Sequence, residues 1–378
     1  MKKLRIATVF SGIGSIEFAL KRLNVEHEIV FACDNGERDD VKIDAESEFK
    51  KIKEMGSIKE KHDYVEELYA KLTSKKNYVQ ESYLANYVCP KDRFYQDVRL
   101  LDGTDFNGEV DLFVGGSPCQ SFSSVGHQLG LEDTRGTLFY DFARLVDEIK
   151  PKVFIYENVR NLINHDKGRT WQVINDVFHQ LGYRISFSIL DAANYGIPQH
   201  RRRLFVVGYK EEKNAFSFPE TRKLKYKMLD FMIDNCKFGC FTYLKNGELK
   251  IVKKDGKVDM KYYLSPLLYN YVMKSGTKGW YQKPEINKEI ARTLLKTMGN
   301  RHRAGVDNYF SNDGSEDLGK VRMLTEREAH RLMGYTDDYK IVVSRAQAYK
   351  QAGNSIVVDV MMAIVNQILK DEVFERSN

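Results

Sequence analysis

The sequence is poor in the features that mark secreted, membrane-spanning and metal-stabilised proteins. Its 378 residues include five cysteines, seven prolines and two tryptophans. No run of 18 uncharged apolar residues occurs, so we expect no membrane span. The apolar start is too short and too interrupted by glycine for a signal peptide, and it reads as a strand. The cysteines are odd in number and scattered, which predicts reduced thiols in a cytoplasmic protein.

A zinc site is also not expected. Cys236 and Cys240 are the only close cysteine pair, and no second Cys or His pair has the spacing of metal ligands.

Charge is present but unevenly distributed. The chain carries a net charge of +6, yet the segment 219–303 holds 19 Lys and Arg residues against 8 Asp and Glu. That segment is therefore +11 and the remainder is −5. One positive block beside an acidic body is typical of nucleic-acid binders. A solvated, lysine-rich surface is the plainer alternative.

Apolar runs of strand length alternate with helical spacing up to about residue 218. This pattern predicts an α/β fold with a doubly wound, mostly parallel sheet. A glycine-containing turn separates the first strand from a helix over 16–23. The predicted strands are 4–10, 28–33, 110–114, 153–156 and 204–207.

Two segments depart from this alternation. Residues 37–76 are rich in Lys and Glu with helix-spaced apolar residues, which predicts one or two solvated helices inserted between the second and third strands. After Pro219, recurrent turns predict short strands and loops, and at 347–369 a turn leads into one long apolar helix. We therefore divide the chain into one domain of residues 1–218 and 344–378 and a second, smaller domain of residues 219–343.

Acidic residues follow the first strands at positions suited to a nucleoside. The turn 10–14 contains two glycines, which alone is weak evidence for a nucleotide-like ligand. Asp34 ends the second strand, where a carboxylate can accept hydrogen bonds from ribose hydroxyls. Asp97 follows the inserted segment and can receive an adenine amino group. Together these positions predict an adenosine-containing cofactor.

One cysteine is placed as a nucleophile would be. Cys119 lies in a Gly-Ser-Pro turn directly after the strand 110–114, at the edge of the sheet where ligands bind. A buried structural cysteine is the alternative. Glu157 follows the strand 153–156 at the same edge. An ion pair is the usual role of such a glutamate, but in a dry pocket its pKa should rise, so that it can donate a hydrogen bond.

Arginines alternate at the start of the strand near 204. Arg201 and Arg203 should share one face, with His200 and Arg202 on the other. Two guanidinium groups aimed at a cleft suit a phosphate or a base carbonyl, although arginines can also simply cap a sheet edge.

These short motifs occur in a characteristic order. They are Phe10-x-Gly12-x-Gly14, Asp34, Asp97, Pro118-Cys119-Gln120, Glu157-Asn158-Val159, Gln199-x-Arg201-x-Arg203, Arg322-x-Leu324-Thr325-x-Arg327-Glu328 and Gly353-Asn354-Ser355. In this series the chain resembles the DNA (cytosine-5) methyltransferases over nearly its whole length. The segments 37–76 and 219–321 lie outside the match.

The resemblance implies a Rossmann-like methyltransferase domain that binds S-adenosylmethionine. Phe10 would pack on the adenine, Asp34 would bind the ribose, Asp97 the adenine edge, and Ser355 the methionine end. The full set of cofactor residues implied is Phe10, Ser11, Gly12, Ile13, Gly14, Ser15, Asp34, Asn35, Asp97, Val98, Pro118, Leu138, Asn354 and Ser355.

The resemblance also implies a reaction and a substrate. Cys119 would attack C6 of a flipped-out cytosine, while Glu157 holds N3 and the exocyclic amine. Arg203 would bind the O2 side, with Arg201 supporting it or binding a phosphate. The smaller domain would recognise double-stranded DNA. The expected DNA contacts are Gln120, Ser124, Arg135, Thr293, Arg301 and Arg303.

Other readings remain open. A tRNA cytosine methyltransferase has the same core, although the long basic segment favours DNA. A non-catalytic DNA-binding relative would not need Cys119, Glu157 and Arg203, and a dinucleotide oxidoreductase would leave Cys119 unexplained. We expect a monomer, with a cognate restriction endonuclease as a possible partner.

Overall fold

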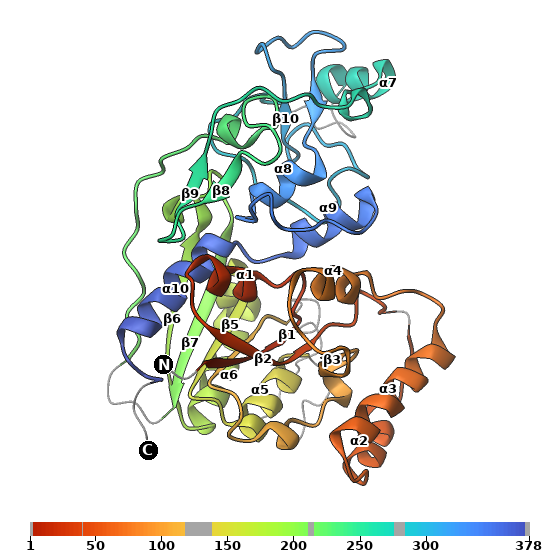
Figure 1. Cartoon of the computed structure of the whole chain (residues 1–378), viewed down its shortest axis with the longest axis vertical. Coiled ribbons are helices and arrows are strands. Elements are labelled where there is room, and N and C mark those ends of the chain that lie inside the picture. Colours follow the sequence, from red (N-terminus) through yellow and green to blue (C-terminus); the bar gives the residue numbers. More distant parts are fainter. Residues whose placement is uncertain (1–2, 40, 118–137, 211–214, 276–283, 375–378) are drawn as a thin grey trace.

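A seven-stranded sheet forms the centre of the lower part of the molecule (Figure 1). The computed structural model describes residues 3–39, 41–117, 138–210, 215–275 and 284–374. The strands are β1 (Leu4–Val9), β2 (His27–Cys33), β3 (Phe94–Tyr95), β4 (Leu112–Gly115), β5 (Val153–Val159), β6 (Tyr183–Asp191) and β7 (Arg202–Lys210).

Strand order confirms the predicted α/β fold. The strands run β3-β2-β1-β4-β5-β7-β6, and only β7 is antiparallel to its neighbours β5 and β6. Because β1 pairs in parallel with both β2 and β4, the carboxyl ends of these three strands lie at the same edge of the sheet. Phe10, Asp34 and Gly116 directly follow β1, β2 and β4, so the topology brings these residues to a common region.

Helices cover both faces of the sheet. Alternate residues of β4 show why: Leu112 and Val114 face one core cluster with α1 and α10, while Phe113 faces another with α5 and α6. Figure 1 shows α1 and α10 above the sheet and α5 and α6 below it. The bounds are α1 (Ser15–Arg22), α5 (Leu138–Ile149), α6 (Arg169–Gln180) and α10 (Val358–Lys370).

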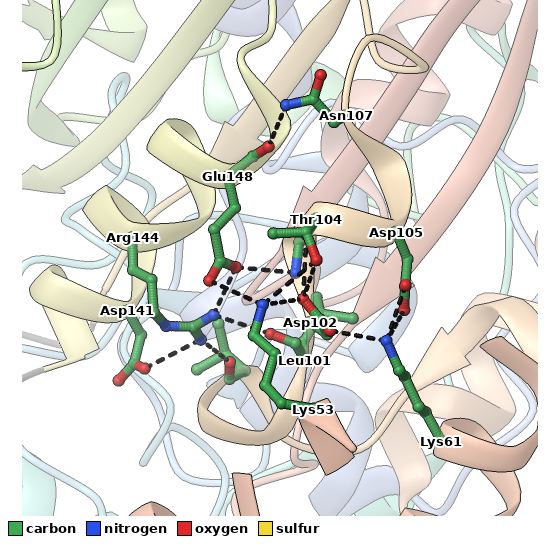
Figure 2. A network of polar contacts seen from close by, with 12 residues as sticks. Lys53, Lys61, Leu101, Asp102, Thr104, Asp105, Asn107, Asp141, Arg144 and Glu148 are labelled. Carbon is green, nitrogen blue, oxygen red and sulfur yellow. Dashed lines mark hydrogen bonds and ion pairs between the residues drawn. The ribbon is translucent and has the colours of Figure 1, made fainter. Parts of the chain in front are cut away.

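The inserted segment forms helices, as its spacing predicts. Between β2 and β3 lie α2 (Ala45–Lys53), α3 (Ile58–Leu72) and α4 (Tyr78–Asn86). Figure 2 shows how α2 and α3 are attached: Lys53 and Lys61 both reach Asp102, at 2.5 and 2.7 Å. Lys61 also pairs with Asp105 at 2.8 Å. The insertion is therefore fixed to the sheet domain by partly buried charge pairs.

The upper part of Figure 1 contains short strands and loops, as predicted for the second domain. Its elements are β8 (Phe241–Tyr243), β9 (Leu249–Ile251), β10 (Tyr309–Phe310), β11 (Arg322–Met323), α7 (Pro266–Asn270) and α8 (Glu326–Arg331). Short helical turns of 3₁₀ or π type join the elements of the whole chain. They are η1 (Lys91–Arg93), η2 (Val98–Leu100), η3 (Gly103–Phe106), η5 (Arg160–Gly168), η6 (Ala192–Tyr195), η7 (Met228–Phe231), η8 (Met260–Tyr262) and η9 (Tyr271–Ser275).

The prediction for the last 30 residues was wrong in part. Where a turn was expected, residues Arg345–Asn354 form a helix, α9, which precedes the apolar helix α10. The stretch Arg345–Lys370 has the length and hydropathy of a membrane span, but 67% of its most apolar window is buried inside the protein, as in a core helix. Since α9 contacts α8 of the upper part and Glu37 of the lower part, the domain boundary at 344 stays a prediction.

Candidate active site

A carboxylate and a guanidinium lie together where β5 and β7 pair. Glu157 Oε1 is 3.3 Å from Arg203 Nε, and both side chains are largely buried. The predicted end of the strand before Glu157 was wrong, because β5 continues to Val159, which pairs with Arg203 of the antiparallel β7. Burial raises the pKa of Glu157, while the charges of Arg203 and Arg201 oppose the rise. The carboxyl group is thus suited to hold a proton.

The absence of a side chain at Gly116 makes room for this carboxyl group. A Cβ there would lie 2.7 Å from the Glu157 carbonyl oxygen and 3.0 Å from Oε2. The chain leaving β4 therefore passes directly beside Glu157. Cys119 is three residues further along, so the segment that leads to it starts beside the Glu157 carboxyl group.

Asn158 fixes the residue that leads into this turn. Its amide Nδ2 donates to the Ser117 carbonyl oxygen and to the Tyr156 hydroxyl, both at 2.9 Å. The hydroxyls of Ser117 and Tyr156 are also 2.7 Å apart. Sequence reasoning assigned no role to Asn158, although it belongs to the Glu157-Asn158-Val159 motif. The predicted site residues Pro118, Cys119, Gln120, Ser124 and Arg135 lie outside the described residues.

Arg201 faces the same side as Arg203, as the alternation predicts, but its guanidinium binds the protein itself. It donates to the carbonyl oxygens of Leu294 at 3.0 Å, Gly353 at 3.0 Å and Ser355 at 2.8 Å. Burial, together with the charge of Arg203, lowers the pKa of Arg201 to about 9, although Glu157 opposes the change. The expected phosphate contact is therefore at odds with this geometry, because Arg201 ties α9 and the Leu294 segment to β7.

His200 and Arg202 turn to the opposite side, as the alternation predicts. Both contact Asp191 Oδ2 at 3.1 Å.

The loop between β1 and α1 forms a cradle beside Asp34. Phe10 and Gly12 both have a φ of +53°, and Gly14 has a φ of +73°. This left-handed backbone turns the Gly12 N–H toward Asp34 Oδ2 at 2.9 Å, while the Gly36 N–H reaches Oδ1 at 2.8 Å. A carboxylate accepts about four hydrogen bonds, so Asp34 keeps capacity for the two hydroxyls of a ribose. The cradle fits a nucleoside.

Tyr87 explains why position 14 is glycine. The Tyr87 hydroxyl donates to the carbonyl oxygens of Ile13 at 2.9 Å and Gly14 at 2.6 Å. A Cβ on Gly14 would lie 2.2 Å from the Tyr87 ring. Tyr87 therefore holds the β1–α1 loop from the segment that follows α4. No motif in the sequence pointed to it.

Asp97 lies after β3 as expected, but its acceptor positions are already filled. Oδ1 accepts the backbone N–H and Nε of Arg99, both at 3.0 Å. Oδ2 accepts the Tyr69 hydroxyl at 2.8 Å and Nη2 of Arg99 at 2.6 Å. An adenine amino group can bind this carboxylate only by replacing one of these donors.

The remaining predicted cofactor residues are distributed around the same edge. Asn354 Nδ2 donates to Glu37 Oε1 at 2.6 Å, which brings the end of α9 to the loop after β2. The Ser355 hydroxyl lies 3.0 Å from that of Tyr335. Ser11 donates from its hydroxyl to the Cys33 carbonyl at 3.1 Å. The others lie near the ends of elements: Ile13 just before α1, Ser15, Val98 and Leu138 at the first positions of α1, η2 and α5, and Asn35 just after β2.

Of the predicted DNA contacts in the second domain, two form hydrogen bonds within the protein. Arg303 donates to Asp307 at 3.3 Å and to the Thr297 hydroxyl at 2.9 Å, and its predicted contact with DNA stays a prediction. The Thr293 hydroxyl donates to the His200 carbonyl oxygen at 2.5 Å, and Arg301 is exposed. Thr293 and Arg301 stay predictions.

Comparison with known proteins gives a consistent result. The family model described as C-5 cytosine-specific DNA methylase matches residues 67–370. The Type II methyltransferase M.SsoII of Shigella sonnei is 34% identical over 304 residues, which span 77% of this chain and 71% of that protein. M.HhaI of Haemophilus parahaemolyticus is 35% identical over 260 residues, 68% of this chain and 75% of that protein. The orphan methyltransferase M.SPRI of Bacillus phage SPR is 33% identical over 98% of both chains.

Solved structures share the fold at lower identity. The crystal structure of S. pombe Dnmt2 superposes with a TM-score of 0.66 and 16% identity, covering 98% of this chain and 99% of its own. A putative DNA modification methyltransferase from an E. coli prophage gives a TM-score of 0.62 and 18% identity, covering 99% and 100%. At this identity the likeness shows the fold alone.

Proposed function

Because this chain belongs to the C-5 cytosine-specific DNA methylase family and is a DNA (cytosine-5) methyltransferase, we propose that it methylates cytosine through a covalent adduct between Cys119 and C6 of the base. Enzymes of this family use S-adenosylmethionine, which supplies an electrophilic methyl group when bound. The observation that carries the proposal is the Glu157 carboxyl group, held beside Arg203 and against the Gly116 turn that leads to Cys119.

The chemistry assigns a separate task to each side chain. The Cys119 thiolate adds to C6 of cytosine, and the electron pair of the C5–C6 double bond becomes available at C5 to take the methyl group. Glu157 gives a hydrogen bond to N3 as negative charge develops on the ring, and Arg203 binds O2. The C5 proton then leaves to water, the bond from Cys119 to C6 breaks, and the thiolate is restored.

The cofactor binds, in this proposal, over the β1–α1 loop. Asp34 accepts the ribose hydroxyls on the oxygen positions that Gly12 and Gly36 leave free, and Phe10 packs against the adenine. Asn354 and Ser355 would close the methionine end, since the contact between Asn354 and Glu37 brings them to the loop after β2, close to Asp34 in the sequence. Arg201 acts here as a positioning residue that holds Ser355.

Access to C5 requires the cytosine to leave the duplex, so we propose base flipping into the space beside Glu157. The basic segment 219–303 then binds the DNA backbone, and we propose Thr293 and Arg301 among its contacts. We further propose a monomer that acts in the cytoplasm as the modification enzyme of a restriction–modification system.

Methylation of defined substrates tests this function. The purified protein is incubated with S-adenosylmethionine and either duplex DNA or tRNA. The DNA or tRNA is then sequenced after bisulfite treatment. We expect 5-methylcytosine within one short DNA motif and none in tRNA. Methylation of tRNA alone, or none by protein that binds the cofactor, contradicts the proposal.

The covalent step is tested with S-adenosylmethionine and a duplex that carries 5-fluorocytosine at the target. After methyl transfer, C5 holds fluorine instead of a proton, so the adduct cannot resolve. The unaltered protein should form a denaturation-resistant adduct, and Cys119→Ser should form none. Cys89→Ser is the matched control, because the thiol of Cys89 already donates to a carbonyl oxygen, as a serine hydroxyl can. An adduct with Cys119→Ser would overturn the mechanism.

A further inference from the structure

The inserted helix α3 reaches the predicted adenine end of the cofactor site through one side chain. Tyr69 is 4% exposed, and its hydroxyl donates to Asp97 Oδ2 at 2.8 Å. Arg99 covers the same carboxylate from the other side, but the Arg99 side chain is 35% exposed. The two donors therefore differ: Arg99 can swing into solvent, whereas Tyr69 is enclosed by protein.

Arg38, in the loop after β2, also holds Tyr69 in place. The Arg38 guanidinium lies over the Tyr69 ring, 4.6 Å from its centre. Arg38 Nε also donates to the Asn35 carbonyl oxygen at 2.7 Å, directly after Asp34. One stacked pair thus links the end of β2, which carries the predicted ribose ligand, to Asp97 beyond β3.

The contacts that attach the insertion to the sheet domain also fix the position of Tyr69 relative to Asp97. Lys61, Val65 and Tyr69 are spaced four residues apart, so they share one face of α3. Val65 is 4% exposed, and Lys61 forms the ion pairs with Asp102 and Asp105 that Figure 2 shows. The face of α3 that is clamped to the sheet domain is therefore the face that presents Tyr69 to Asp97.

We propose that Tyr69 is a positioning residue for cofactor binding and that the insertion serves as a wall of the adenine pocket. The proposal rests on the proposed function, in which Asp97 binds the adenine amino group. An amino N–H of the adenine replaces an N–H of Arg99 on Asp97, while the Tyr69 hydroxyl stays bound and fixes the direction of the remaining lone pair.

The test compares two ligands that differ at the group Asp97 would bind. Isothermal titration calorimetry measures the affinity of the full-length protein for S-adenosylhomocysteine and for its deaminated counterpart, S-inosylhomocysteine. We expect the unaltered protein to prefer the amino ligand by tenfold or more, as estimated roughly from a hydrogen bond to a charged group. Tyr69→Phe should weaken binding of the amino ligand by about fivefold and leave that of the inosyl ligand within about twofold.

Two variants control the interpretation. Tyr64→Phe removes a hydroxyl from the same helix that donates to Glu48 rather than to Asp97, and it should leave the ligand preference unchanged. Arg99→Met should bind the amino ligand no more weakly than the unaltered protein, because Arg99 is the donor to be replaced. A fivefold loss of affinity for the amino ligand in Arg99→Met would show that the adenine amino group does not replace Arg99 on Asp97.

The outcomes separate the two proposals. An unaltered preference in Tyr69→Phe, or an equal loss for both ligands, would overturn the role of Tyr69. Equal affinity of the unaltered protein for the two ligands would instead show that Asp97 does not read the adenine, which removes that part of the proposed function.

Discussion

A buried glutamate near the β1–α1 loop should make stability depend on pH. Glu17 is 1% exposed, and its Oε1 accepts the Tyr83 hydroxyl at 2.5 Å and that of Thr8 at 3.2 Å. Its Oε2 has no hydrogen-bond partner among the described residues. Burial raises the pKa of Glu17 to about 7, although the hydrogen bonds of Tyr83 and Thr8 oppose the rise. The Thr8 hydroxyl in turn lies 2.7 Å from that of Ser11 in the β1–α1 loop.

The sign of the pH dependence follows from this pKa. Between about pH 4.5 and 7 the folded protein holds a proton on Glu17 that the unfolded chain releases, so the free energy of unfolding falls as pH rises. The stabilisation is complete below pH 4.5 and is lost above about 7. Glu17→Gln stays neutral at every pH and should remove up to about 3 kcal/mol of this dependence.

Urea denaturation at pH 5.5, 7 and 8.5 measures this effect. The unfolding free energy of Glu17→Gln should fall less with pH than that of the unaltered protein. Glu26→Gln, at an exposed position between α1 and β2, should keep the original slope. A slope that is the same in Glu17→Gln and the unaltered protein would contradict the role of this carboxyl group.

At the scale of elements, periodicity predicted which helices and strands form but not what they touch. The spacing of apolar residues located α2 and α3, and alternation placed Arg201 and Arg203 on one face. Neither pattern reveals that Arg201 binds the Ser355 carbonyl, 154 positions away, or that Tyr69 meets Asp97. Such contacts depend on packing between distant segments, which local sequence does not encode.

The end of β5 illustrates the same limit. Glu157 was expected just beyond a strand, but strand length is set by the partner, and β7 pairs with β5 as far as Val159. The sequence carries no local stop signal there. Residues with a chemical task were predictable where a motif marks them, and supporting residues such as Asn158 and Tyr87 were not.

The attachment of the insertion is the property to test at this scale. Burial alone would raise the pKa of Asp102, but hydrogen bonds from Lys53, Lys61 and Thr104 outweigh burial and hold that pKa far below its usual range. This contribution to stability is therefore present near neutral pH and is lost only in strong acid. Lys61→Met removes one of the two lysines from a carboxylate that is 2% exposed, and should cost about 2 kcal/mol.

Hydrogen exchange read by mass spectrometry locates the loss. Exchange in Lys61→Met should rise within α2 and α3, while β1 and β4 keep their protection. Lys71→Met is the matched control on α3, because Lys71 pairs only across the exposed helix surface with Glu67. Uniform exchange across the sheet and the insertion would contradict a local clamp.

For the whole molecule, one buried arginine joins segments that are far apart in the sequence. Arg22 at the end of α1 is fully buried and donates to Asp359 of α10 at 2.7 Å. It also donates to the carbonyl oxygen of Gly247, between β8 and β9, at 2.7 Å and to that of Gly334 at 2.9 Å. The sheet domain and the segment that contains β8 and β9 thus share an anchor. The core cluster that runs from β1 through Phe241 to α10 crosses the same boundary.

A shared anchor and core predict that the two parts unfold together. Arg22→Met leaves the Asp359 carboxylate buried without its main partner and should cost about 3–5 kcal/mol, measured by urea denaturation. Hydrogen exchange should then rise in β8 and α10 alike. Lys21→Met is the control at the neighbouring position, because Lys21 joins the same parts through Asp338. Both of these side chains are more than 40% exposed, so this substitution should cost under about 1 kcal/mol. Loss of protection in β8 alone would mean that the segment that contains β8 and β9 folds as a separate unit, and Arg22 would then serve only to dock it.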